Sequence, residues 1–333
     1  MLRDREGILA GLRELQSRVR EAVLRARGTA ALSNVQRATS ADTIYQLDMQ
    51  VEPVIEEFCE EWSRTLPMVV IAEGLEPETG RTFPQGLKEE DAAVRIILDP
   101  VDGTRGLMYD KRSAWSLAGA APNKGSETRL SDVEVAIMTE LPTSKMGFGD
   151  VLWAMRGEGA RGERESLEGN SSRRLELRPS SADSIDHGFA SIANFFPGTK
   201  ILASELMEHV ASELIPKGDL GRATVFDDQY ISTGGQWYEL IVGHDRFSAD
   251  LRPLFYAIQK SESGICVHPY DAAALLVAEE AGVIVTNGLG GKLDSVLDLN
   301  SNLAWAGFAN ERIRSRIEPL ILQFLRGKEL KRE

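Results

Sequence analysis

Apolar residues in the first 62 positions recur with helical spacing. Charged side chains separate apolar positions that lie three or four residues apart, namely Ile8, Leu12, Leu15, Val19 and Val23. This spacing predicts an amphipathic helix. A second helix is predicted from about Asp48 to residues 65–67, with an apolar face formed by Val51, Val54, Ile55, Phe58 and Trp62.

Short apolar runs follow and predict strands. Residues 68–72 are apolar and lead directly to Glu73, and residues 95–98 lead to Asp99. Such runs, bounded by turn residues, are typical of buried strands, so two strands are expected to end in carboxylates. Because the next runs are separated by turns and not by helices, a meander is expected, with strands at 115–121, 133–138 and 151–155.

A polar segment divides the chain. Residues 156–184 are rich in Gly, Arg, Glu and Ser, and a hairpin arm is expected at 174–177. Segments of this composition are typical of domain boundaries. The chain is therefore divided into an N-terminal α+β half, 1–178, and a C-terminal α/β half, 179–333, which completes the site described below.

The second half predicts strands that alternate with helices. Helices are expected at 203–214 and at 271–281, the latter ending at Gly282. The terminal helix is expected to be interrupted at Pro319, because proline lacks the N–H that a helix interior uses. Strands are expected at 189–193, 238–242 and 283–286.

The composition is that of a globular chain. Its 333 residues are 42% hydrophobic and 27% charged, which excludes a disordered or collagen-like protein. No apolar run approaches the roughly 18 residues of a membrane helix, and the charged start MLRDREG is unlike a signal peptide, so a cytoplasmic location and no membrane partner are expected. Cys59 and Cys266 cannot form a disulfide framework. The net charge of −13 argues against a nucleic acid polymer as partner.

Two motif matches are rejected on context. Gly157, Gly159 and Gly162 spell G-x-G-x-x-G, but charged residues follow where a dinucleotide fold needs an apolar helix, so a turn is expected. Residues 102–104 resemble the D-x-D-G-T element of haloacid-dehalogenase-type phosphatases, which attack with an aspartate. Pro100 holds the position of that nucleophile, so covalent attack by the protein is not expected.

Four acids form the candidate chemical centre: Glu73, Asp99, Asp102 and Asp271. An acid at a strand end or a helix start is by itself most often a cap. Three of these acids lie at element ends in the first half, and one lies at a helix start in the second. Together they predict a carboxylate cluster that hard cations such as Mg²⁺ neutralise. In the turn D-P-V-D-G-T, Gly103 and Thr104 offer backbone N–H groups to a phosphate.

These motifs resemble the inositol monophosphatase superfamily of magnesium-dependent, often lithium-sensitive phosphomonoesterases. The most specific mark is D-P-x-D-G-T at residues 99–104. The other marks stand in family order over residues 35–325, as the acid-opened helix at Asp48, the strand-end Glu73, the G-x-G-A turn at 157–160 and the D-x-A-A…E-A-G element at 271–282. The resemblance implies an α/β (α+β) fold, the layered αβαβα sandwich of that family, and a homodimer.

The resemblance also implies a centre with two or three Mg²⁺ ions. The implied ligands of two ions are Glu73, Asp99, the Val101 carbonyl, Asp102 and Asp271. Asp48 is expected near a weaker third ion. Thr104 with Glu73 or Asp48 would orient a metal-activated water, and Gly103 and Thr104 would bind the phosphate.

Several positions depart from the family pattern and bear on the substrate. Gly74 stands where a second acid is common, Tyr270 replaces a usual Trp, and Arg105 with Gly106 is closer to the adenosine bisphosphate phosphatases. The acid that inositol enzymes place before the late Asp aligns with Gly264. The substrate-binding residues implied by the family are Asp102, Asp271 and the nearby Glu262.

The expected function is therefore Mg²⁺-dependent hydrolysis of a small phosphate monoester, either inositol monophosphate or a related sugar or polyol phosphate. Three alternatives stay open at this point. They are a phosphatase of 3′-phosphoadenosine 5′-phosphate in the same superfamily, a non-catalytic phosphate-binding relative, and a structural subunit in which the acids are caps.

Overall fold

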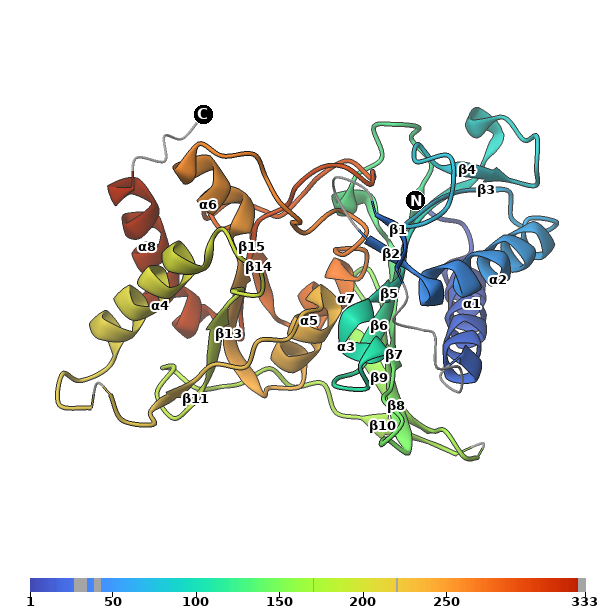
Figure 1. Cartoon of the computed structure of the whole chain (residues 1–333). Helices are drawn as coiled ribbons and strands as arrows, with labels where there is room; N and C mark the ends of the chain where they lie inside the picture. The colour runs from blue at the N-terminus through green and yellow to red at the C-terminus, as the bar shows by residue number, and fades with distance from the viewer. Residues whose placement is uncertain (27–34, 39–42, 170, 220, 329–333) are drawn as a thin grey trace.

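The computed structural model describes residues 1–26, 35–38, 43–169, 171–219 and 221–328, with backbone alone for 35–38 and 43–49. Figure 1 shows five layers side by side, in the order helices, sheet, helices, sheet, helices. This arrangement confirms the expected αβαβα sandwich. A separate ribbon pairs β1 (Val35–Ala38) with β2 (Thr43–Tyr45).

The first sheet contains eight strands in the order β10-β9-β8-β7-β6-β5-β3-β4. Adjacent strands of this sheet are antiparallel, except for β3 and β5, which run parallel. The strands are β3 (Met68–Ala72), β4 (Arg81–Phe83), β5 (Val94–Asp102), β6 (Ala114–Pro122), β7 (Val135–Leu141), β8 (Phe148–Met155), β9 (Ala160–Ser166) and β10 (Ser172–Leu175). The predicted meander is thus confirmed. The predicted hairpin arm is β10, placed two residues earlier than expected.

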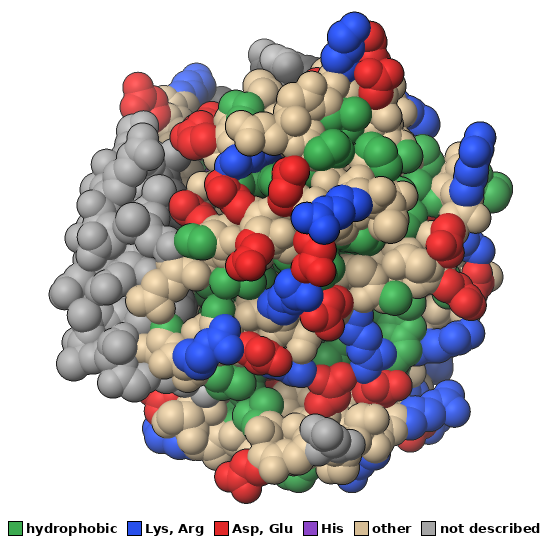
Figure 2. All heavy atoms as spheres, turned by 90° about the vertical axis from the view of Figure 1, so that its right-hand side faces the viewer, with side chains coloured by type: hydrophobic (Ala, Val, Ile, Leu, Met, Phe, Trp, Pro, Cys, Tyr) green, Lys and Arg blue, Asp and Glu red, His purple; other side chains and the backbone are tan. Residues whose placement is uncertain are grey.

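Helices cover both faces of this sheet, which explains why β3 and residues 96–98 of β5 are continuous apolar runs. All nine residues of β5 are buried. The first face packs against α1 (Arg5–Ala26) and α2 (Gln46–Trp62), whose predicted apolar positions, except Val54, form one core with β3, β5, β6 and β7. Figure 2 looks onto this side of the molecule, where Lys and Arg side chains intermingle with Asp and Glu and do not gather by sign.

The second sheet contains five strands in the order β12-β11-β13-β15-β14. Strands β11, β12 and β13 are parallel to one another, and β15 is antiparallel to both of its neighbours. The strands are β11 (Gly188–Ile192), β12 (Val225–Phe226), β13 (Asp245–Asp250), β14 (Ile284–Thr286) and β15 (Trp305–Phe308). The outer helices are α4 (Lys200–Leu214), α6 (Arg252–Gln259) and α8 (Glu311–Gly327).

Two helices lie between the sheets, α5 (Thr233–Ile241) and α7 (Leu275–Glu280), as Figure 1 shows. The core around them draws residues from both halves of the chain, among them Trp115 and Leu117 of β6, Trp237 of α5, Ala273 and Trp305. The short helices α3 (Thr104–Met108), η1 (Glu89–Asp91) and η2 (Leu130–Asp132) complete the fold.

Three sequence predictions need correction. Residues 238–242 are not a strand, because Trp237, Leu240 and Ile241 are spaced to bury one face of the helix α5. Pro319 does not interrupt α8, whose buried stripe of Ile313, Ile317, Ile321 and Leu325 continues past it. The helix predicted at 271–281 begins at Leu275, with Asp271 in the turns before it.

The boundary predicted at 156–184 is also too long. Residues 156–175 extend the first sheet through β9 and β10, and the chain passes to the second sheet between Leu175 and Gly188. Gly157 and Gly159 of the G-x-G-x-x-G segment lie in the β8–β9 turn, as expected, with φ values of 81° and 74°, whereas Gly162 lies in β9. The division into two domains at 178 and 179 stays a prediction. No helix in the described residues has both the length and the apolar character needed to span a membrane.

Gly119 lets the central strand β6 approach the turn that carries Asp271. A Cβ at this position would lie 2.5 Å from the backbone oxygen of Ala273, and a backbone oxygen cannot rotate away. We expect Gly119→Ala to lower the free energy of unfolding by about 1–3 kcal/mol, the usual cost of overpacking. Urea unfolding measures this loss. Gly147→Ala is the control, because a Cβ there meets nothing within 4 Å. Equal urea midpoints for the two variants would contradict the close approach.

Candidate active site

A cavity of about 120 Å³ opens at the carboxyl end of β5, between the two sheets. Both halves of the chain line it. The lining residues of the first half are 73, 99 and 101–105, and those of the second half are 195–196, 231–233, 252, 265–267 and 270–271. Four of the predicted acids therefore meet at one cavity.

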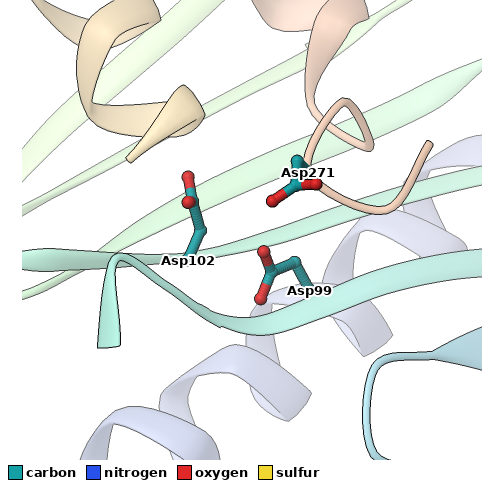
Figure 3. A group of neighbouring side chains, drawn as sticks. All are labelled: Asp99, Asp102 and Asp271. Atoms are coloured by element: carbon teal, nitrogen blue, oxygen red, sulfur yellow. The ribbon is translucent and has the colours of Figure 1, made fainter. Parts of the chain in front are cut away.

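A β-bulge turns Asp99 and Asp102 toward the same side of β5. Asp99 pairs with Leu117 and Asp102 pairs with Trp115, so three steps along β5 oppose two along β6. In a regular strand, residues three apart point to opposite faces. The extra residue of the bulge cancels that alternation. Figure 3 shows both side chains on the same side of the strand, near Asp271, which comes from a different segment.

The turn after the bulge is built on local hydrogen bonds. The backbone N–H of Val101 donates to Asp99 Oδ1 at 3.0 Å, and Thr104 Oγ1 donates to the Val101 carbonyl at 2.8 Å. Gly103 has a φ of 95°, in the left-handed region that glycine adopts without strain. These contacts direct Thr104 into the cavity beside the acids.

Asp271 is brought to the cluster by the turn that precedes α7. Its Oδ2 accepts a hydrogen bond from the His268 N–H at 2.6 Å, which closes that turn. One oxygen each from Asp99, Asp102 and Asp271 lie within 4.8 Å of one another. Asp271 thus shares one potential ion site with residues that lie 172 and 169 positions before it in the sequence.

The amino end of α5 holds Asp102. Ser232 Oγ donates to Asp102 at 2.8 Å, the Gly234 N–H at 2.6 Å and the Thr233 N–H at 3.3 Å. Sequence reasoning missed these three residues. The segment S-T-G-G before an apolar periodic stretch is a helix-start signal that could have identified them. It competes with the strand predicted at 238–242.

Burial and the repulsion of neighbouring acids raise the pKa values of Asp99 and Asp102. The pKa of Asp99 lies well above its usual value, first because the carboxyl is buried and then because of Glu73, Asp102 and Asp271. Burial and the charge of Asp271 raise the pKa of Asp102 to about 7, against the opposing effect of its three hydrogen bonds. Such a set of buried oxygen ligands fits a hard divalent cation, which would offset the repulsion.

The other predicted residues have different positions. Glu73 follows β3 and lines the cavity with the three aspartates. Asp48 lies in the first turn of α2, but its side chain is outside the described part of the chain. Glu262 is exposed in the loop after α6 and is not among the lining residues. At Gly264, a Cβ would lie 2.5 Å from the Tyr256 hydroxyl, so a longer side chain does not fit there without rearrangement.

An arginine and aromatic wall faces the acids, which the sequence analysis did not foresee. The buried Arg252 pairs with Asp250 through Nε and Nη2 and donates from Nη1 to the Ile265 carbonyl at 2.7 Å. Its guanidinium lies 5.2 Å from the ring centre of Phe196. Cys266 also lines the cavity, and burial raises the pKa of its thiol to about 12, which keeps it protonated at neutral pH.

Two of the motifs that resemble the family, the G-x-G-A turn at 157–160 and the D-x-A-A…E-A-G element at 271–282, also contact each other away from the acids. Glu280, at the end of α7, accepts hydrogen bonds from the backbone N–H groups of Gly157 at 2.7 Å and Gly159 at 2.8 Å. The contact ties α7 to the β8–β9 turn. Both motifs therefore fix the helix that follows Asp271.

Comparison with known proteins supports the fold. No family model matches the sequence. A curated relative, the fructose-1,6-bisphosphatase/inositol-1-monophosphatase of Methanothermobacter thermautotrophicus, is 23% identical over 232 residues, which are 68% of this chain and 68% of that protein.

Solved structures of similar fold extend over nearly the whole chain. The extragenic suppressor protein suhB of Bartonella henselae has a TM-score of 0.64 and 17% identity, and covers 95% of this chain and 98% of its own. The fructose-1,6-bisphosphatase of Leishmania major has a TM-score of 0.69 and 14% identity, with coverage of 97% and 95%. The fold implied by the family resemblance is thus confirmed.

The raised pKa values predict a pH dependence of metal-free stability. Because folding favours the protonated forms of Asp99 and Asp102, their contribution to stability is greatest at low pH and declines as the pH rises through the folded-state values, which reach about 7 for Asp102. Asp99→Asn removes one buried charge. We therefore expect this variant to lose less stability than the wild type between about pH 5 and pH 8 in EDTA.

Thermal unfolding at each pH measures this difference. Glu140 and Asp245 also have pKa values raised to about 7, so they titrate in this pH range in the wild type and in Asp99→Asn alike. The difference between the two stability curves therefore isolates the contribution of Asp99. Parallel curves for Asp99→Asn and the wild type would show that Asp99 carries no such penalty.

Proposed function

We propose that this chain hydrolyses a small phosphate monoester, a sugar or polyol phosphate such as inositol monophosphate, with the help of Mg²⁺. The observation that carries the proposal is the approach of Asp99, Asp102 and Asp271 to within 4.8 Å of one another at the wall of a cavity. The names of the curated relative and of the Leishmania major structure state related phosphatase activities for those proteins.

The ligand sets follow from the side chains at the cavity. We propose that Glu73, Asp99 and the Val101 carbonyl hold one ion, and that Asp99, Asp102 and Asp271 hold a second, with Asp48 near a weaker third. Divalent ions bound there would lower the pKa of a water molecule and stabilise negative charge on the leaving oxygen. All of these ligands are oxygen atoms, as Mg²⁺ prefers.

Thr104 is suited to orient the attacking water. Its Oγ1 donates its proton to the Val101 carbonyl at 2.8 Å, so the same oxygen can accept a hydrogen bond from the water. Glu73 lines the same cavity and would take up the proton. We propose that the N–H groups of Gly103 and Thr104 bind the phosphate oxygens. Pro100 occupies the position of an aspartate nucleophile, so direct attack by water is the proposed route.

The walls of the cavity bear on the substrate. We propose that Asp102 and Asp271 bind substrate hydroxyls. Glu262 does not line the cavity, so it does not belong to this set. Arg105 and Arg252 bring positive charge to the lining, which suits a phosphorylated ligand. None of the relatives reported above has a nucleotide phosphatase activity in its name, so the nucleotide alternative is not favoured. Lithium sensitivity, a homodimer and a cytoplasmic location stay predictions.

A phosphate-release screen tests the proposal. Purified protein with Mg²⁺ is offered inositol 1-phosphate, fructose 1,6-bisphosphate, other sugar phosphates and 3′-phosphoadenosine 5′-phosphate, with EDTA as control. We expect release from at least one sugar or polyol phosphate and none in EDTA. Release that persists in EDTA, or activity confined to the nucleotide, would overturn the proposal. No release from any ester would favour the non-catalytic alternative.

Asp102 is the ligand that tests the metal assignment. We expect Asp102→Asn to lower kcat by about two orders of magnitude or more at limiting Mg²⁺, because such an ion contributes several kcal/mol to charge stabilisation. The volume of the side chain hardly changes, so circular dichroism should be unaltered. Wild-type kcat in this variant would contradict the assignment.

Thr104 tests how the water is oriented. We expect Thr104→Ala to lower kcat by about 10²–10⁴-fold, the usual contribution of a positioned proton-transfer group. Thr104→Ser keeps the hydroxyl and should retain far more activity. If steady-state kinetics show the same loss for both variants, Thr104 acts through its methyl group and not through Oγ1.

A further inference from the structure

The geometry of Asp102 depends on a segment that is remote from it in sequence. Its three hydrogen-bond donors lie at 232–234, so whatever holds this segment in place also orients the carboxylate. The segment begins beside Tyr230, which is 5% exposed. The contacts of Tyr230 therefore bear on the proposed metal site.

Tyr230 is fastened to the start of β6. Its hydroxyl donates to the Ser113 carbonyl at 2.9 Å and accepts from Trp115 Nε1 at 3.0 Å. The Tyr230 ring packs against the helix α5 at Gly235, where a Cβ would lie 2.3 Å from a ring atom. Tyr230 thus joins the amino end of α5 to the strand that pairs with β5.

Arg112 lies across this junction. Its guanidinium carbon is 3.7 Å from the centre of the Tyr230 ring. Nη1 binds Asp228 Oδ2 at 2.7 Å, before α5, and Nη2 binds Glu239 Oε1 at 2.9 Å, near the end of α5. One side chain therefore holds the α5 segment on both sides of the donors to Asp102.

The backbone of Arg112 belongs to the loop that follows the D-P-V-D-G-T turn. Its N–H donates to the Gly106 carbonyl at 3.2 Å. Arg112 is not among the residues that line the cavity. Arg112 therefore connects the loop after Asp102 with the α5 segment that binds Asp102, although it does not itself reach the cavity.

The charges around Arg112 make it difficult to replace. Burial, with the charges of Glu239 and Asp228, raises the pKa of Asp245 to about 7, against the opposing effect of Arg112 and His244. Arg112 is thus a cation that three neighbouring acids share. Without it, Asp228, Glu239 and Asp245 would repel one another across the base of α5.

We propose that Arg112, acting through Tyr230, is a positioning residue for the metal site. It holds residues 230–235 on the start of β6, so that Ser232, Thr233 and Gly234 keep Asp102 oriented toward Asp99 and Asp271. The inference rests on the proposed function, because it makes the affinity of the acid cluster for a divalent ion depend on the contacts of Arg112. The competing explanation is a structural ion pair that contributes to stability alone.

Direct binding of Mg²⁺ separates the two explanations. Isothermal titration calorimetry of the metal-free protein gives the Kd for Mg²⁺ without any turnover. We expect Arg112→Met to raise this Kd about 10-fold or more, as is usual when a residue that orients a metal ligand is removed. Arg112→Lys keeps one charge but cannot bind two carboxylates from a planar fork, so its Kd should fall between those of the wild type and Arg112→Met. Tyr230→Phe loses the hydroxyl contacts and should also weaken binding.

Arg13→Met is the matched control. Arg13 is 35% exposed, against 30% for Arg112, and it likewise pairs with two distant acids, Glu163 and Glu165, and lies over an aromatic ring, that of Trp153. It lies on α1, away from the cavity. This variant should lose stability in EDTA without a change in the Kd for Mg²⁺.

The outcomes are distinguishable from those of the proposed function. If the wild type and Arg112→Met bind Mg²⁺ equally while unfolding of the variant in EDTA shows lower stability, the positioning role is wrong and the ion pair is structural. If Arg13→Met weakens Mg²⁺ binding as much as Arg112→Met, the effect is general destabilisation, and the inference again fails. A wild type that binds no Mg²⁺ would overturn the proposed function itself, and the positioning role with it.

Discussion

Repulsion among carboxylates that are held together inside the protein is the constraint on which the rest of this structure depends. Asp99 and Asp102 are buried, and with Asp271 they place three acidic groups within 4.8 Å. Each of the three accepts at least one backbone N–H, from Val101, Gly234 and His268 respectively. These dipoles lower the cost of the negative charge but do not remove it, as the raised pKa values of Asp99 and Asp102 indicate. A bound cation is the natural counterpart of such a cluster.

The origin of the donors differs among the three acids. Val101 and His268 lie two and three residues from the carboxylates that they bind, so local turn geometry supplies those contacts. Asp102 takes its donors from α5, about 130 residues away. Its orientation is therefore a property of the packed molecule, and α5 keeps its place through contacts with β6 and the loop before it. This dependence makes the α5 segment as important to the site as the motif that contains Asp102.

The two sheets meet over a single core, which explains how both halves serve one cavity. Helices α5 and α7 are contributed by the second half but pack between the sheets with residues of β6, β7 and β8. The absent side chain at Gly119 allows the turn that carries Asp271 to come close to β6. Glu280 then binds the β8–β9 turn from the far end of α7. Several motif residues thus serve to place a catalytic candidate and do not enter the cavity themselves.

Local patterns in the sequence determined a mixed α and β chain, the meander of the first half and the principal acids, whereas the layered sandwich was implied by the family resemblance alone. Apolar runs predict β3 and β5, and the short spacing of D-P-V-D-G-T already marks Asp99, Asp102 and Thr104 as one unit. Local patterns could not show that the amino end of α5 binds Asp102, that Glu262 lies outside the cavity, or that Arg252 lies within it. Those facts depend on contacts between segments separated by a hundred residues or more. Only the packing of the two sheets around their shared helices decides them, because pattern and propensity act over a few residues whereas a site of this kind is assembled across the whole chain.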